Sequence, residues 1–192
     1  MNKSRLEAFS DGVLAIIITI MVLELKVPEG SSFSNLEKLF PKFLAYILSF
    51  IYVGIYWNNH HHMLQTVKKV TGAILWSNLH LLFWLSLIPF VTAWAGDNNF
   101  SNAPMMLYGI VLLCNALAYI VLQYHIIHAH GKESLLAKAV GNDSKGKISL
   151  LLYTLGILLA YSLPFISGII YTIVALLWLI LDKRIEKIVA EY

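Results

Sequence analysis

Six long apolar segments alternate with short polar segments along the 192-residue chain. A helix that crosses the hydrocarbon core of a bilayer needs about 20 mostly apolar residues. The pattern therefore predicts an all-α integral membrane protein, with one transmembrane domain over residues 1–192 and six membrane-spanning helices. The expected spans are residues 6–25, 41–63, 72–95, 104–127, 148–163 and 166–182.

The last two spans are predicted as separate helices because a proline and a glycine lie between them, in the sequence SLPFISG. Proline interrupts a helix, and glycine with proline favours a tight hairpin. One helix from residue 148 to residue 182 would contain about 35 residues, which is too long for a single crossing without extreme tilt. We therefore expect two short helices here.

Lysine and arginine residues predict the orientation of these spans. With the N-terminus in the cytoplasm, eleven of the fourteen basic residues lie on the cytoplasmic side, which is the side that such residues favour. The three on the outer side are Lys26, Lys38 and Lys42. If spans five and six were merged, Lys183, Arg184 and Lys187 would move outside and weaken the bias. The charge pattern thus predicts six spans with both termini cytoplasmic.

Composition narrows the classes of protein further. The chain is 58% hydrophobic and 13% charged, whereas a soluble domain has about a quarter of its residues charged. The single cysteine, Cys114, excludes an intramolecular disulfide and a thiolate metal site. The loops are too short for a soluble catalytic domain and contain no phosphate-binding motif, so we expect no enzyme activity and no nucleic-acid partner. The first apolar segment lacks a signal-peptide cleavage pattern, and we expect it to be retained as a membrane helix.

The first span carries polar residues just inside its N-terminal end. Arg5, Ser10 and Asp11 precede a fully apolar stretch, and charges within a membrane are usually paired or functional. Two interpretations are open, a structural cluster of hydrogen bonds and ion pairs or a direct ion-binding site. The position near the membrane boundary favours the structural cluster.

Further along the first span, Ile16, Ile20 and Leu23 share a sector of roughly 80° with Arg5 and Phe9. Beside this sector runs a stripe of small residues, which allow helices to approach closely in lipid. The stripe consists of Ala8, Gly12, Ala15 and Thr19. From the spacing alone, lipid contact or ordinary helix packing explains the three bulky residues.

The motif Arg5-x-x-x-Phe9-Ser10-Asp11 resembles the signature of the transmembrane protein 175 family of potassium-permeable channels. The sequence YWNNHHHML, residues 56–64, is similar to that family's W-x-x-H-H segment. Six helices with both ends inside also agree with the family, so the resemblance covers the whole chain. The chain contains one six-helix unit, as the bacterial members do.

This resemblance implies a homotetramer in a bacterial inner membrane, surrounded by lipid, with the first helices around a central pore. No cofactor is implied other than the permeating K⁺. The constricting position corresponds to Ile16, with Ile20 and Leu23 further out, and Thr19 corresponds to a hydroxyl linked to potassium preference. Ala15 replaces a serine of the lysosomal members, so we expect weak to moderate selectivity for potassium. A constriction of apolar side chains gates by dewetting.

The resemblance also implies that the second helix is tied to the first. Trp57 and either His61 or His62 are expected to pack and hydrogen-bond against the Phe9-Ser10-Asp11 cluster. The seven histidines show no metal-binding motif, and structural roles are favoured over a pH-sensing role. A secondary transporter is the alternative function, but midplane charges that would form a substrate site are absent. The polar residues Asn78, His80 and Asn115 are sufficiently explained by interhelical hydrogen bonds.

Overall fold

The structure is a computed structural model that describes residues 2–181. All regular secondary structure in this part of the chain is helical, which confirms the predicted all-α class. The helices are α1 (Lys3–Leu23), α2 (Phe33–Glu37), α3 (Phe40–Gln65), α4 (Gly72–Ser86), α5 (Ile88–Asp97), α6 (Asn102–His130), α7 (Leu135–Val140), α8 (Ser144–Ala160) and α9 (Pro164–Leu181).

Each predicted span coincides with helical structure. Four stretches are long and apolar enough to cross a membrane, namely α1, α3, α4 with α5, and α6. Helices α8 and α9, at the predicted fifth and sixth spans, are shorter, with 17 and 18 residues. The short helices α2 and α7 lie in the two longest loops and were not predicted.

The third predicted span is interrupted at Pro89, which divides it into α4 and α5. Proline has no backbone N–H, and its ring collides with the carbonyl four residues earlier, so a helix kinks or breaks there. At this break the carbonyl of Trp84 accepts hydrogen bonds from the Leu87 backbone N–H, at 3.2 Å, and from Asn115 Nδ2 of α6, at 3.4 Å. Backbone polar groups freed within a membrane need such partners. The Asn115 side chain of α6 therefore helps to stabilise the interrupted helix.

A tight turn separates α8 from α9, as the proline and glycine predicted. Helix α8 ends at Ala160 and α9 begins at Pro164, and the backbone N–H of Leu163 donates to the carbonyl of Leu159 at 2.7 Å. The predicted end of the sixth span at residue 182 lies outside the described residues, as do the basic residues at 183, 184 and 187.

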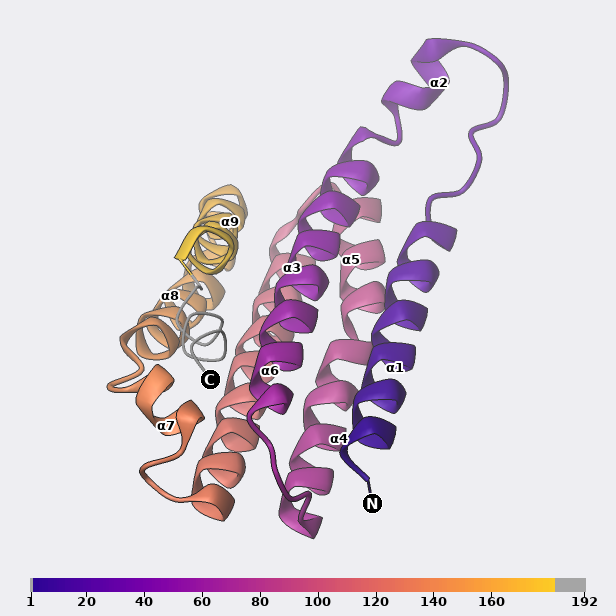
Figure 1. Ribbon diagram of the computed structural model, residues 1–192. Coiled ribbons are helices and arrows are strands. Elements are labelled where there is room, and N and C mark those ends of the chain that lie inside the picture. Colours follow the sequence, from indigo (N-terminus) through magenta and orange to yellow (C-terminus); the bar gives the residue numbers. More distant parts are fainter. Residues whose placement is uncertain (1, 182–192) are drawn as a thin grey trace.

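Helix α1 lies at one edge of the bundle, and α8 and α9 lie at the opposite edge (Figure 1). It packs on α3, α4 and α5, whereas α6 lies in the interior and contacts α4, α5, α8 and α9. The α1 residues buried by this packing are Leu6, Ser10, Leu14, Ile17 and Met21. Their spacing of three to four residues defines one face of the helix, and the other helices within residues 2–181 leave the opposite face of α1 uncovered.

Candidate functional site

The uncovered face of α1 carries the residues that the sequence analysis singled out for a pore. Ile16, Ile20 and Leu23 have 58%, 43% and 75% of their surface exposed. Ile17, only one residue further than Ile16, is 3% exposed because it points into the bundle. The structure therefore brings the three bulky residues together on one side of a single helix.

This face also carries groups that lipid tails would not solvate well. Arg5 and Thr19 are exposed on it, and Gly12 leaves a gap in its side-chain surface. The Thr19 hydroxyl donates to the carbonyl oxygen of Ile16 at 2.9 Å, which leaves the lone pairs of the hydroxyl oxygen free to accept. The face is thus mixed in polarity, unlike a helix surface that contacts only lipid.

The buried side of α1 is fixed by a hydrogen-bonded chain that joins three helices. The Ser10 hydroxyl donates to the Leu6 carbonyl at 2.9 Å and accepts from Asn78 Nδ2 of α4 at 3.0 Å. Asn78 Oδ1 lies 2.6 Å from His60 Nε2 of α3. Because the carbonyl at the end can only accept, every donor in the chain is determined, and His60 Nε2 carries the hydrogen. Ser10, Asn78 and His60 are almost completely buried, so each polar group needs its partner.

A second contact ties α3 to α1 at the surface of the bundle. Trp57 Nε1 donates to Asp11 Oδ1 at 3.1 Å, and both side chains are exposed. The Trp57 ring stacks on His61, with 6.1 Å between ring centroids. Phe9 is also exposed beside these groups. The exposed part of the predicted cluster therefore borders the uncovered face of α1.

The histidine in the buried chain is His60, not the expected His61 or His62. Both of the expected histidines make their described hydrogen bonds to Gln65, at 2.9 Å and 3.3 Å. Helical periodicity explains the difference, because His60 lies four residues after the buried Tyr56 and shares its side of α3. His61 and His62 lie one and two residues further along α3, so their side chains point away from this buried side and are half-buried. The phase of the buried tyrosines was the signal that could have identified His60.

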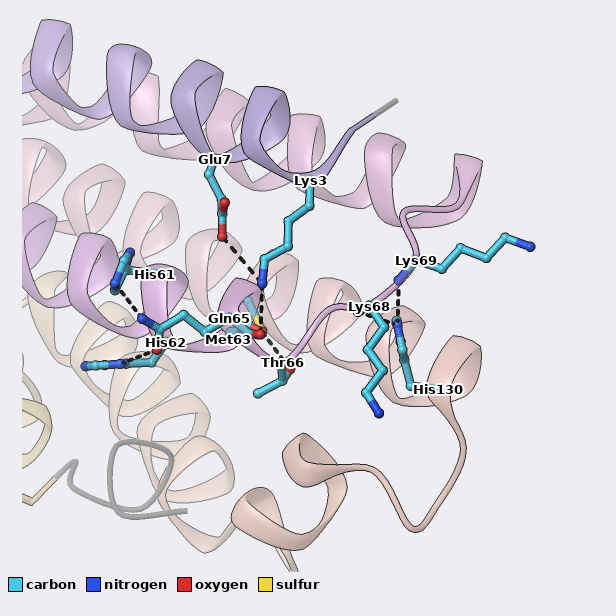
Figure 2. A network of polar contacts seen from close by, with 10 residues as sticks. All are labelled: Lys3, Glu7, His61, His62, Met63, Gln65, Thr66, Lys68, Lys69 and His130. Carbon is cyan, nitrogen blue, oxygen red and sulfur yellow. Dashed lines mark hydrogen bonds and ion pairs between the residues drawn. The ribbon is translucent and has the colours of Figure 1, made fainter. Parts of the chain in front are cut away.

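At the N-terminal end of α1, a further polar network connects α1 with the end of α3 (Figure 2). Lys3 Nζ donates to the backbone carbonyl of Gln65 at 2.9 Å and lies 3.8 Å from Glu7 Oε1. The Gln65 side chain lies between His61 and His62. This network and the buried chain hold the same end of α1.

The remaining polar residues fit structural roles. Asn78 and Asn115 make interhelical hydrogen bonds, as expected, whereas His80 accepts from Trp84 of its own helix at 3.0 Å. Among residues 2–181, no group of three or more histidine, cysteine, aspartate or glutamate side chains has an arrangement that could hold a metal ion.

The arrangement can be compared with known proteins. The family described as "Endosomal/lysosomal potassium channel TMEM175" matches residues 5–89, which include α3, α4 and α1 from Arg5 onward. A potassium channel from Chryseobacterium sp. (strain P1-3) is 60% identical over 191 residues, and the match covers 100% of both chains. The chain belongs to the TMEM175 family.

Two other members place this TMEM175 chain among its relatives. A crystal structure of a lysosomal potassium-selective channel TMEM175 homolog from Chamaesiphon minutus has a TM-score of 0.81 and 27% sequence identity. The structural match covers 92% of this chain and 96% of the Chamaesiphon minutus chain. The human endosomal/lysosomal proton channel TMEM175 is 40% identical over 96 residues, and the match covers 43% of this chain and 19% of the human protein. The resemblance predicted from the RxxxFSD motif is therefore confirmed.

Proposed function

We propose that this TMEM175 protein is a potassium-permeable cation channel whose pore is lined by the uncovered face of α1. The single observation that carries the proposal is the division of α1 into two faces. One face is packed and anchored by buried hydrogen bonds, and the other exposes Ile16, Thr19, Ile20 and Leu23 in one row. The relatives with extended matches are named as potassium channels and not as enzymes, which supports the same function.

A pore between copies of α1 requires several chains, and we propose a homotetramer. Four copies of the exposed face would meet on a common axis, with Ile16 as the narrowest ring. The small residues Ala8 and Ala15, beside this row, allow neighbouring helices to approach closely. Thr19 oxygens, one turn further along, would replace part of the hydration shell of a passing cation. Selectivity for potassium is expected to be weak to moderate, because Ala15 offers no hydroxyl.

For orientation we propose six spans with both termini in the cytoplasm of a bacterial cell and a location in the inner membrane. The turn between α3 and α4 carries Lys68 and Lys69, whereas the loop around α2 carries a mixture of charges. The positive-inside rule places the lysine-rich turn in the cytoplasm. The N-terminal end of α1, with Arg5 and Asp11, is then the cytoplasmic entrance of the pore.

Recording from the purified protein in planar bilayers tests the proposal. The parent should pass a current that does not saturate at high potassium, with a reversal potential in unequal K⁺ and Na⁺ that shows a modest preference for K⁺. The Ile16→Asn substitution should raise conductance about tenfold, which corresponds to a barrier lower by ~1.4 kcal/mol. Its physical reason is that a polar side chain keeps the constriction wetted.

The matched control is Leu158→Asn on α8, at the opposite edge of the bundle, where 69% of the leucine surface is exposed. This variant should conduct like the parent. Equal conductance of the parent, Ile16→Asn and Ile16→Phe would show that Ile16 does not line the pore. A saturable flux coupled to a second ion would contradict a channel and indicate a transporter.

A further inference from the structure

One imidazole fastens the turn between α3 and α4 to the end of α6 (Figure 2). His130, the last residue of α6, has its Nε2 atom 3.0 Å from the backbone N of Lys68 and 3.2 Å from that of Lys69. Its Nδ1 atom lies 2.9 Å from the carbonyl oxygen of Ile126, one turn earlier. A single side chain thus joins segments that are 62 residues apart in the sequence.

The partners of this ring determine its protonation state. Backbone N–H groups only donate, so Nε2 must be an unprotonated acceptor, and a carbonyl oxygen only accepts, so Nδ1 must carry the hydrogen. Neither partner can rotate or flip to exchange these roles. A proton added to Nε2 would point at two N–H groups and abolish both hydrogen bonds. The contact therefore requires the neutral imidazole.

Charged groups of both signs lie on the elements around the ring. Lys68 and Lys69 lie on the turn itself (Figure 2). Lys132 follows α6 in the sequence. Near α7, Glu133 is paired with Lys138 at 3.4 Å. Titratable groups on the other neighbouring elements include His125 and His128 on α6, His61 and His62 on α3, and the Lys3–Glu7 pair on α1. The first turns of α4 contribute no charged residue.

The fastened turn is directly connected to α1. It begins at Thr66, next to Gln65, whose backbone carbonyl accepts a hydrogen bond from Lys3 Nζ of α1. Movement of the turn would therefore displace the carbonyl that holds the N-terminal end of α1. The same end of α1 leads to the proposed pore-lining face.

We propose that His130 is a proton-sensitive clamp on the α3–α4 turn. The neutral ring holds the turn against α6, and protonation of Nε2 at acidic pH releases the turn. The local clamp follows from the contacts alone. Its location in the cytoplasm and its effect on current rest on the proposed function.

Hydrogen–deuterium exchange of the full-length protein in nanodiscs tests the local clamp. We measure the protection of the backbone amides in the turn relative to their intrinsic exchange rates, with the turn at residues 98–101 as an internal reference that lacks histidine. Between pH 8 and pH 5.5 the parent should lose about tenfold protection at Lys68 and Lys69, which corresponds to ~1.4 kcal/mol. His130→Ala should have low protection at both pH values.

Two variants separate the clamp from general effects. His130→Gln keeps an acceptor that does not titrate, and its protection should not depend on pH. His128→Ala removes a neighbouring exposed histidine, which stacks on Tyr124, and should retain the pH dependence of the parent. Equal protection of the parent turn at both pH values, or an equal loss in His130→Ala, would overturn the clamp.

Current recorded in inside-out patches tests the coupling to the pore. Between cytoplasmic pH 8 and pH 5.5 the parent current should change, and this change should be absent in His130→Gln and retained in His128→Ala. A parent that conducts without any dependence on cytoplasmic pH would overturn the coupling. A parent that does not conduct would contradict the proposed function and leave the exchange result as a separate test of the clamp.

Discussion

At the scale of single residues, the hydrogen-bonded chain through Ser10, Asn78 and His60 is the most sensitive feature of the bundle. All three side chains are buried, and Asn78 is the middle member with one bond to each neighbour. Asn78→Ala should lower the free energy of unfolding by about 1–3 kcal/mol, because it leaves the His60 ring donor without its partner. Thermal or denaturant unfolding of the purified protein in detergent measures this loss.

Asn58→Ala is the matched control, since Asn58 is exposed on the same helix as His60. An equal loss in both variants would show that the buried chain has no special role.

The sequence predicted that Asn78 bonds between helices, because a polar side chain in an apolar span needs a partner. It did not identify His60 as that partner, because two adjacent histidines offered the same chemistry and only the phase of the helix distinguishes them.

At the scale of helices, Tyr171 of α9 is packed against two glycines on different helices. Gly109 of α6 and Gly156 of α8 leave space for the ring, and a Cβ atom on either would overlap it. Gly156→Ala should therefore destabilise the protein by about 1–3 kcal/mol through overpacking. Gly54→Ala on α3 is the control, because no atom lies within 4 Å of its added methyl group, and it should be neutral or stabilising by up to ~1 kcal/mol. Unfolding in detergent compares the two, and a Gly156→Ala protein as stable as the parent would contradict the packing.

The helices were predictable from the sequence to different degrees. Apolar length located the long helices, and Pro164 marked the turn before α9. Pro89 was an equally good signal for the division of α4 from α5. The break was not predicted, because the residues on both sides of the proline form one continuous apolar run. The contact of Tyr171 with Gly109 was not predictable, because it depends on which helices are neighbours and not on the period of any one helix. The uncovered face of α1 was predictable only in part. The sequence identified its residues, but their exposure depends on how α3, α4 and α5 pack against the other side of α1.

At the scale of the whole molecule, the proposed orientation of the six spans predicts the accessible side of each loop. Single-cysteine variants in a Cys114→Ser background test it with a membrane-impermeant maleimide on intact cells. Ser34→Cys in α2 and Leu163→Cys between α8 and α9 should be labelled from outside, and Glu133→Cys before α7 should be labelled only after permeabilisation. The result at Leu163 decides between six spans and five, because a merged fifth span would not expose it to the outside. Absence of labelling at Leu163→Cys in intact cells in which Ser34→Cys is labelled would contradict the sixth span and with it the cytoplasmic C-terminus.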